Sequence, residues 1–498
     1  MSASERIANL INGRWQPAAS GHTLESRNPA DVDEVVAIAP ASAARDVDEA
    51  VAAARAAFPA WRAVPAPKRG EVLFRAAERL AREKEDLARI VTREMGKVIA
   101  EARGDVQEAV DMAYYMAGEG RRLSGQTVPS ELPNKDAKSV RVPLGVCGLI
   151  TPWNFPVAIP SWKVLPALVA GNTAVLKPSE LTPLCATRFV QILQDAGLPP
   201  GVLNLVHGYG EGVGDALAGH RDVNVVSFTG SSAVGEQIEA VCGRLHRPVC
   251  TETGGKNPLI VMDDADAELA VEGALWGGFG TSGQRCTAAS RVIVHEAVYG
   301  AFVARFVGAA KTLRLGSGLD SATHVGPVIS AEQQRMVLEY IAIGKKEGAT
   351  LLCGGHAPTG APLAKGHFIV PTIFGDVTPG MRIAQEEIFG PVVSVLKARD
   401  LGHAIEIANN VAYGLSAAIY TRDVNKSAAA ERDLDTGIVY VNASTIGAEI
   451  QLPFGGTKRT GLGPREAGGR GGALDLYTKW KVIYRDYSGK LQKAQIDA

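Results

Sequence analysis

The first part of the chain has a helical rhythm of apolar and polar positions. Residues 43–62 are rich in alanine, and residues 67–118 carry apolar side chains at the spacing of one helical turn. Proline and glycine interrupt this pattern and mark the ends of elements. We therefore predict a helix over 43–62 and a longer helical region over 67–118.

From residue 145 the pattern changes to short apolar runs separated by helical segments. The runs GVCGLITPW, NTAVLKP, GVLNLVHG and VNVVSFTGS are typical of strands, and TRFVQILQDAG is typical of a helix. A second series follows Thr253, with NPLIVM and SRVIVH as strands, YGAFVARFVGAAKTL as a helix, and then HFIVPTIF, PVVSVLKA, AIEIANN and GIVYVNA. Alternation of this kind predicts two α/β lobes built on parallel sheets.

The C-terminal segment YTKWKVIYRDYSGK alternates between apolar and polar positions and predicts a last strand. A terminal strand needs a pairing partner, and a second subunit is one candidate.

Composition narrows the class of protein. The 498 residues include 52 basic and 53 acidic side chains, a balance too neutral for a non-specific nucleic-acid binder. The hydrophobic fraction of 46% excludes a disordered chain, and the 55 glycines follow no collagen period. A large soluble α/β enzyme is the expectation that remains.

Cysteines and apolar segments indicate the compartment. Six scattered cysteines with no C-x-x-C exclude a disulfide framework and a zinc site, so we expect no metal. The most apolar stretch, 142–171, contains five prolines and Lys163, which argues against a membrane span. Glu5 and Arg6 precede any apolar run, so no signal peptide is visible and a cytoplasmic location is expected.

Two glycine motifs invite a nucleotide interpretation. Gly278–Gly283 matches G-x-G-x-x-G but follows no predicted strand, so we interpret it as a chance match. Gly230–Gly235 follows the strand VNVVSFT and opens a helix, although Glu236 and Gln237 replace the Lys and Ser/Thr of a P-loop. A helix N-terminus there suits a pyrophosphate, and a simple glycine turn explains the motif equally well.

The segment Lys177-Pro178-Ser179-Glu180 follows the predicted strand TAVL. Carboxyl ends of parallel strands are where ligands bind, and Glu180 there would accept the two ribose hydroxyls of an adenosine and repel a 2′-phosphate. Taken alone, the segment is also a common start of a helix.

Cys286 stands apart from the other cysteines. It follows FGTSGQR, so small residues surround it and Arg285 precedes it. A helix start or a nearby cation would lower its pKa and supply a thiolate nucleophile, whereas the bland alternative is a buried small side chain. Glu252 precedes a glycine turn, a setting that alone indicates no more than a surface residue.

Together these segments resemble the aldehyde dehydrogenase superfamily over nearly the whole chain. The motifs occur in the order of that family: TPWNFP (151–156), LKPSE (176–180), FTGSSAVG (228–235), ETGGKNP (252–258), FGTSGQRC (279–286), EEIFGPV (386–392) and PFGGTKRTGLGPREAG (453–468). One such motif could arise by chance, but seven in order could not.

The resemblance implies an α/β fold with a modified Rossmann cofactor lobe, an α/β catalytic lobe and a bridging β arm for oligomerisation. It implies an NAD(P)-binding domain at 1–120 and 144–252, a catalytic domain at 253–455, and a bridging element at 121–143 and 473–498. A homodimer or homotetramer follows from such an arm.

The resemblance also implies catalytic roles. Cys286 would attack the aldehyde, Asn154 and the Cys286 backbone N–H would hold the oxyanion, and Glu252 would be the general base, with Lys163 near the chamber. A thioester on Cys286 would follow hydride transfer to the nicotinamide.

The resemblance implies NAD as the cofactor, with NADP as the alternative, and acid formation from a small-molecule aldehyde. The residues expected to contact the cofactor are Trp153, Lys177, Ser179, Glu180, Gly230, Ser231, Gly254, Glu387 and Phe389. Core packing is the alternative role for the two aromatic residues.

Two positions depart from the family pattern. Thr253 replaces a frequent Leu, which should alter packing more than chemistry. Lys479 stands where many members have a carboxylate in a late Y-T-E segment, so a proton relay through that carboxylate is in doubt, and Glu466 is no established substitute.

Candidate substrate selectors are the loop 442–449, ending in Glu449, and the pair Glu108 and Arg285. These features are similar to branches that act on semialdehydes, with 2,5-dioxopentanoate as the first candidate, aminoadipic semialdehyde as the second, and broad specificity as the coarser alternative. Arg285 could instead turn away from the tunnel into a salt bridge.

Two other classes of function remain open. A binding protein that keeps the fold would have no need of Cys286, Glu252 and Asn154 together. A cysteine hydrolase would use Cys286, but none of the nine histidines has a comparable glycine-flanked setting, and the cofactor motifs would be unexplained.

Overall fold

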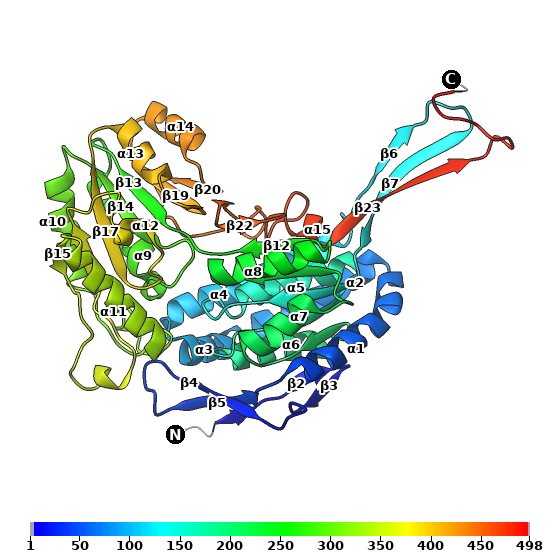
Figure 1. The fold of residues 1–498 in the computed structure, drawn as a ribbon, viewed down its shortest axis with the longest axis horizontal. Coiled ribbons are helices and arrows are strands. Elements are labelled where there is room, and N and C mark those ends of the chain that lie inside the picture. Colours follow the sequence, from blue (N-terminus) through cyan, green and yellow to red (C-terminus); the bar gives the residue numbers. More distant parts are fainter. Residues whose placement is uncertain (1–3, 497–498) are drawn as a thin grey trace.

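The computed structural model describes residues 4–496 and consists of two α/β lobes and a projecting β arm (Figure 1). The N-terminal half of the chain builds most of the first lobe, and the segment that follows β12 builds the second. The arm leaves the first lobe and carries the C-terminal end of the chain at its tip.

The first lobe contains an eight-stranded sheet whose five central strands are parallel. In spatial order the strands are β22 (Gly461–Leu462), β12 (Val249–Glu252), β11 (Val225–Thr229), β8 (Val146–Ile150), β9 (Thr173–Lys177), β10 (Leu203–Leu205), β2 (Asn9–Ile11) and β3 (Arg14–Gln16). Numbered along the chain, the parallel strands run 5-4-1-2-3 in this order. The chain therefore reverses direction between β8 and β11, and the carboxyl ends of these strands form the switch point where open sheets bind ligands.

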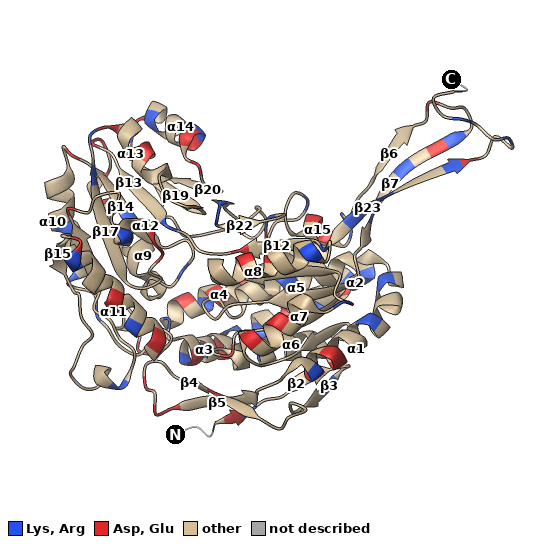
Figure 2. Cartoon of the chain, viewed as in Figure 1, with Lys and Arg blue, Asp and Glu red and all other residues tan. Residues whose placement is uncertain are grey.

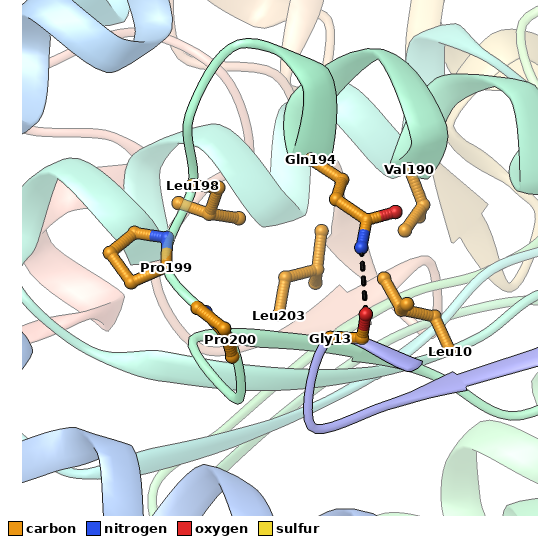
Figure 3. Close-up of a pocket in the computed structure, with 8 residues that line it drawn as sticks. All are labelled: Leu10, Gly13, Val190, Gln194, Leu198, Pro199, Pro200 and Leu203. Carbon is orange, nitrogen blue, oxygen red and sulfur yellow. Dashed lines mark hydrogen bonds between the residues drawn. The ribbon is translucent and has the colours of Figure 1, made fainter. Parts of the chain in front are cut away.

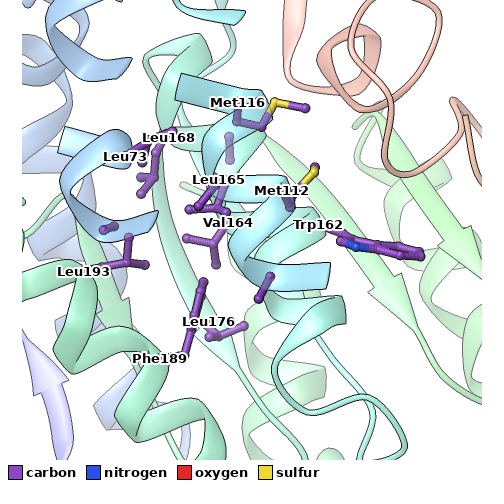
Figure 4. Packing of buried hydrophobic residues seen from close by; sticks show 14 of the residues in the cluster. Leu73, Met112, Met116, Trp162, Val164, Leu165, Leu168, Leu176, Phe189 and Leu193 are labelled. Carbon is purple, nitrogen blue, oxygen red and sulfur yellow. The ribbon is translucent and has the colours of Figure 1, made fainter. Parts of the chain in front are cut away.

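Helices cover both faces of this sheet (Figure 1). They are α1 (Ala44–Ala63), α2 (Ala66–Arg82), α3 (Lys84–Met95), α4 (Ile99–Glu119), α5 (Ala158–Ala170), α6 (Pro183–Asp195), α7 (Asp215–Gly219), α8 (Ser232–Arg244) and α15 (Ala473–Leu476), with a π-helical turn at Gly210–Gly214. Figure 4 shows part of the largest core, in which α2, α4, α5, α6 and β9 contribute interlocking side chains such as Leu73, Met112, Leu165 and Phe189. Helix α5 is buried at every position, so it forms the rigid floor behind the site.

The second lobe contains a seven-stranded sheet with strand order β15 (Thr350–Cys353), β16 (Thr372–Gly375), β17 (Val392–Ala398), β14 (Ala289–His295), β13 (Asn257–Val261), β19 (Ser416–Tyr420) and β20 (Ile438–Val441). All pairs are parallel except β15 with β16. Its helices are α9 (Ala267–Phe279), α10 (Tyr299–Ala310), α11 (Ala331–Lys346), α12 (Arg382–Gln385), α13 (Leu401–Asn409) and α14 (Val424–Asp433), with 3₁₀ turns at Gly280–Gly283 and Leu363–Lys365.

The chain crosses back from the second lobe to the first after residue 455. Strand β21 (Thr457–Lys458) pairs with β18 (Tyr413–Gly414) of the second lobe, and β22 then pairs antiparallel with β12 of the first. The segment that follows β22 therefore lies against the strand that ends at Glu252.

The arm is a three-stranded antiparallel sheet of β6 (Gln126–Pro129), β7 (Lys135–Pro143) and β23 (Thr478–Asp486). Alternation places Trp480, Val482 and Tyr484 on one face of β23, and all three are about half exposed or more. Basic and acidic residues are interspersed over the helices and the arm (Figure 2). Within residues 4–496, no helix is both long and apolar enough to span a membrane.

Most predicted elements are confirmed, with two differences. The region 67–118 is three helices, because the chain breaks at Glu83 and again at Gly96, whose φ of +91° suits only glycine well. The strands near the N-terminus escaped prediction because they are short. Three of them, β1 (Glu5–Arg6), β4 (Thr23–Arg27) and β5 (Val35–Pro40), form a separate sheet. The other two, β2 and β3, lie at the edge of the eight-stranded sheet.

A buried arginine, Arg291, links several segments of the second lobe by hydrogen bonds. The guanidinium of Arg291 donates to the carbonyls of Lys256, Ile407 and Ala408 at 2.9, 2.8 and 2.8 Å. Burial lowers the pKa of Arg291 to about 9. The side chain therefore links β14 to α13 and to the turn that follows β12.

We expect Arg291→Lys to destabilise the protein, because one ammonium group cannot reach all three carbonyls and a buried acceptor left unpaired costs about 1–3 kcal/mol. The melting temperature should fall by about 1–3 °C, since a chain of this length has a large unfolding entropy. Arg305→Lys on the exposed side of α10 is the matched control and should melt like the parent. Equal melting of both variants would contradict a role for Arg291 in tying the lobe.

Candidate active site

A large cleft opens at the switch point of the first lobe. It has a volume of about 460 Å³, within the usual range of ligand sites. The turn after β8, the start of α8, the turn after β12 and the loop before β17 supply its walls. Among the lining residues are Trp153, Asn154, Gly230, Ser231, Gly254, Cys286, Glu387 and Phe389.

A narrower cavity continues from the cleft between α4, α5 and the loop 447–454. It has a volume of about 50 Å³ and contains Glu108, Phe155, Trp162, Glu252, Arg285, Phe454 and Glu466 in its wall. Cys286 and Thr253 line both cavities. The thiol therefore lies where a cofactor cleft and a substrate tunnel would meet.

A third hollow, shown in Figure 3, is packing space and not a site. Its volume is about 30 Å³ and its wall is mostly aliphatic, with Leu10, Val190, Leu198 and Leu203. Its one polar side chain, Gln194, is occupied by a hydrogen bond to the Gly13 carbonyl at 2.9 Å.

The turn before Cys286 has an unusual backbone. Thr281 and Ser282 follow one another in the left-handed region, with φ of +52° and +56°. Such residues cost about 1–3 kcal/mol each and persist only where neighbours hold them. Ser282 donates its hydroxyl to the Gly326 carbonyl at 2.7 Å, and the Gln284 side chain accepts the Ile329 N–H at 2.9 Å. These bonds fix the segment that presents the thiol.

The Asn154 amide lies beside this segment and donates to the Gln284 carbonyl at 3.2 Å. An amide group has two N–H donors, so a second one remains for a ligand oxygen. Asn154 lies in the loop after β8, and Cys286 precedes β14. The site thus combines the two lobes.

The expectation of a lowered Cys286 pKa is wrong. Burial raises it well above the usual range, and the carboxyl groups of Glu387, Glu252 and Glu466 add to the effect. The cation on which the expectation rested, Arg285, turns its guanidinium to Glu101 at 3.3 Å. These surroundings favour the thiol form of Cys286 over the thiolate.

Glu252 ends β12 and is buried in the tunnel wall. Burial raises its pKa well above the usual range, with Glu466 contributing in the same direction. Its Oε2 has no hydrogen-bond partner among the described residues. A carboxyl group of this kind is suited to take a proton from water.

Lys163 and Glu466 lie side by side behind Glu252. The Lys163 Nζ bonds Glu466 and also Ser227 at 2.7 Å, and Thr229 donates to Glu466 at 3.1 Å. From the sequence alone, Lys163 is expected near the chamber, and Glu466 is named only as a relay substitute that is not established. The structure brings Glu466 to Lys163 on the segment that follows β22, which pairs with β12. Lys479, which stands where many members of the family have a carboxylate, is exposed on the arm.

The nicotinamide side of the cleft would be formed by the turn at Gly254 and the loop at Glu387. Glu387 accepts the Gly255 N–H at 2.9 Å, and burial raises its pKa to about 7. A Cβ at position 254 would clash with the Glu387 carboxyl group, so a larger residue there would force Glu387 to move. The Trp153 and Phe389 rings meet edge to face at 5.4 Å.

Helix α8 points its N-terminus into the cleft. Ser231 is its N-cap, and Ser232 and Ala233 follow in the cleft wall. The unpaired N–H groups of such an end suit a phosphate. The Gly230 segment therefore has the strand–turn–helix setting that the sequence predicted.

Lys177 and Glu180 lie farther along the same edge of the sheet, outside the cleft wall. Lys177 ends β9 beside Ile150 of β8, and its Nζ holds Glu180 at 3.1 Å. Ser179 accepts the Leu181 N–H at 3.2 Å, so its hydroxyl shapes the turn.

The predicted substrate residues are only partly brought together. Glu108 and Arg285 line the tunnel, and burial raises the pKa of Glu108 to about 8. Gly447 and Ala448 also line it, but Glu449 is exposed and bonds Gln451. Arg285 both lines the tunnel and forms the ion pair raised as its alternative.

Thr253, which replaces a Leu that is frequent in the family, forms hydrogen bonds in addition to its packing contacts. Its hydroxyl lies 2.9 Å from the Arg459 carbonyl, 3.0 Å from the Thr460 carbonyl and 3.2 Å from the Ser232 hydroxyl. It thus connects the start of α8 with the chain that crosses between the lobes. Among residues 4–496, no group of three or more His, Cys, Asp or Glu could hold a metal ion.

Comparison with known proteins agrees with this geometry. The model of the "Aldehyde dehydrogenase family" matches residues 15–483. An alpha-ketoglutarate semialdehyde dehydrogenase of Haloferax volcanii is 45% identical over 96% of this chain and 99% of its own. An alpha-ketoglutaric semialdehyde dehydrogenase of Bacillus subtilis is 43% identical over 96% and 97%.

Among solved structures, a betaine aldehyde dehydrogenase of Staphylococcus aureus in complex with NAD⁺ superposes with a TM-score of 0.94. It is 36% identical, and the match covers 97% of this chain and 96% of that one. The chain belongs to the aldehyde dehydrogenase family.

We expect alkylation of Cys286 by iodoacetamide to be slow at pH 7 in the protein without cofactor. Only the thiolate reacts, and its fraction grows about tenfold per pH unit below the pKa. Because the Cys286 pKa is raised, the inactivation rate should still climb above pH 9. Free cysteine, with a pKa of about 8.5, is the control and levels off earlier. A plateau near pH 7 would show that the thiolate forms without cofactor.

Proposed function

We propose that this chain oxidises an aldehyde that carries a remote acidic group to the carboxylic acid, with NAD⁺ as the oxidant. The observation that carries the proposal is the position of Cys286 at the junction of the cleft and the tunnel. The relatives named as semialdehyde dehydrogenases support the substrate class, with 2,5-dioxopentanoate as the first candidate.

The cleft is suited to a dinucleotide. The N-terminus of α8 would meet the pyrophosphate, Glu387 the nicotinamide ribose, and Lys177 and Glu180 the adenosine ribose. The Glu180 carboxylate would repel a 2′-phosphate, which favours NAD⁺ over NADP⁺. When bound, the nicotinamide ring accepts the hydride that leaves the substrate carbon.

The protein groups then account for the remaining steps. The Cys286 thiol would release its proton through water to the solvent, and the thiolate would add to the aldehyde carbon, with the Asn154 amide and the Cys286 N–H holding the resulting oxyanion. Loss of hydride leaves a thioester on Cys286. Glu252 takes a proton from water as that water attacks the thioester, and the acid and the thiol are released.

Two side chains in the tunnel wall support the acidic substrate. Arg285 provides a cation there, and a protonated Glu108 would donate a hydrogen bond to a keto or carboxylate oxygen. A neutral aldehyde would gain no charge-assisted hydrogen bond from Arg285, whose Glu101 partner occupies Nη2, so it should bind more weakly than an acidic one.

The first test is the rise of absorbance at 340 nm with NAD⁺ and a panel of acidic, aliphatic and aromatic aldehydes, repeated with NADP⁺. We expect the highest kcat/KM with an acidic semialdehyde and NAD⁺, and no reaction with Cys286→Ala. Glu252→Gln should retain a burst of NADH and lose steady turnover, because only hydrolysis needs the base. Failure of every aldehyde to reduce cofactor would refute the proposal.

We also propose that the arm joins two copies of the chain. In this arm, β23 pairs with β7 along one edge only, and its exposed Trp480, Val482 and Tyr484 form an apolar face.

Val482→Asp should shift the molar mass measured by light scattering toward the monomer, because it places a charge on a face that would be buried. Lys481→Gln, on the opposite face of β23, is the control and should keep the parent mass. A monomeric parent protein would disprove the role of the arm.

A further inference from the structure

One side of α4 carries charged side chains toward the tunnel. Lys97, just before the helix, is followed at helical spacing by Glu101, Asp105 and Glu108. Lys97, Glu101 and Asp105 are buried, with exposed fractions of 1%, 8% and 1%. Buried charged side chains need ion-pair or hydrogen-bond partners. The partners of these residues therefore identify the segments whose positions they fix.

Glu101 makes the contacts nearest the thiol. Both of its carboxyl oxygens accept the Thr281 backbone N–H, at 2.8 and 3.0 Å. Its Oε1 also lies 3.3 Å from the Nη2 of Arg285. Arg285 in turn donates from Nε to the Thr281 hydroxyl at 2.9 Å. The three residues form a closed set of hydrogen bonds.

These bonds act on the strained turn that precedes Cys286. Thr281 is the first of the two left-handed residues, and Glu101 satisfies its buried N–H. Without an acceptor there, the N–H would be unpaired in the interior, at a cost of about 1–3 kcal/mol added to the backbone strain.

The same bonds orient Arg285. Its guanidinium lies over the rings of Trp276 and Phe155, at 5.0 and 5.3 Å, and the Lys97 ammonium lies over Phe155 at 3.7 Å. With Nε and Nη2 engaged, Nη1 has no hydrogen-bond partner among residues 4–496 and remains as a donor in the tunnel wall.

We propose that Glu101 is a positioning residue with two effects: it holds Arg285 toward the acidic end of the substrate, and it holds the turn that presents Cys286. The first effect rests on the proposed function. The second does not, because it concerns only the backbone before the thiol.

Substitutions at position 101 can separate the two effects. In Glu101→Gln the amide oxygen still accepts the Thr281 N–H, but the amide nitrogen cannot pair with Arg285. In Glu101→Ala both contacts are lost. Arg285→Met removes the cation and keeps most of the side-chain volume.

The measurement is kcat and KM at saturating NAD⁺ with 5-oxopentanoate and with pentanal, which have equal chain length and differ in the carboxylate. Glu101→Gln should raise KM for 5-oxopentanoate about tenfold, leave kcat within about twofold, and leave pentanal unchanged. Arg285→Met should act in the same direction. The double variant should be no worse than Arg285→Met, because both changes remove one interaction.

Glu101→Ala should in addition lower kcat with both aldehydes and slow the alkylation of Cys286 by iodoacetamide at pH 9. Glu119→Gln is the control, since Glu119 is also buried on α4 but pairs with Arg122 away from the tunnel. It should change neither the preference between aldehydes nor the alkylation rate.

Each contrary outcome has a distinct meaning. If Arg285→Met changes the preference but Glu101→Gln does not, the orienting effect is refuted. If Arg285→Met itself has no effect, both the acidic-substrate proposal and the orienting effect fail. If Glu101→Ala leaves alkylation unchanged, the effect on the turn is refuted. An equal loss with both aldehydes in Glu101→Gln would indicate a general structural role.

Discussion

The site depends on how the protein compensates charges that it buries around one thiol. Three ion pairs surround Cys286, and breaking a buried pair by removing one partner costs about 3–5 kcal/mol. The pairs are Lys97–Asp105, Arg285–Glu101 and Lys163–Glu466. Arg285–Glu101 and Lys163–Glu466 join residues 184 and 303 positions apart in the chain, so these two pairs help to set the positions of α4, α5 and the turn before the thiol. Lys97 and Asp105 are eight positions apart, and Asp105 also accepts the Ala158 N–H at the start of α5 at 2.7 Å.

The carboxyl groups that take no part in these ion pairs are the ones available for proton transfer or for binding a ligand. Glu252, Glu387 and Glu108 have no salt-bridge partner within the described part of the chain, and burial raises the pKa of each. A raised pKa makes a carboxyl group a better proton acceptor when ionised and a donor when neutral. Burial also raises the pKa of the Cys286 thiol, so the same surroundings favour its protonated form.

Much of the fold and part of the site could be predicted from the sequence. Apolar periodicity located α1 and the parallel strands, and motif order brought Cys286, Asn154 and Glu252 into one hypothesis. Glu466 was named, but its place beside Lys163 and Thr229 could not be predicted, because these neighbours are more than two hundred residues away in the chain. Glu449, named as a candidate selector, is exposed in the structure, and a loop sequence alone does not show which of its side chains face inward.

The sequence by itself determined the local elements, the two-lobe organisation and the family, because periodicity, turn residues and motif order are local or sequential properties. Only the tertiary structure decided the charge state of Cys286, the direction of Arg285 and the place of Glu466. These depend on desolvation and on partners brought close by strand pairing, such as β22 on β12. A pKa is a property of an environment, and that environment exists only once the lobes have assembled.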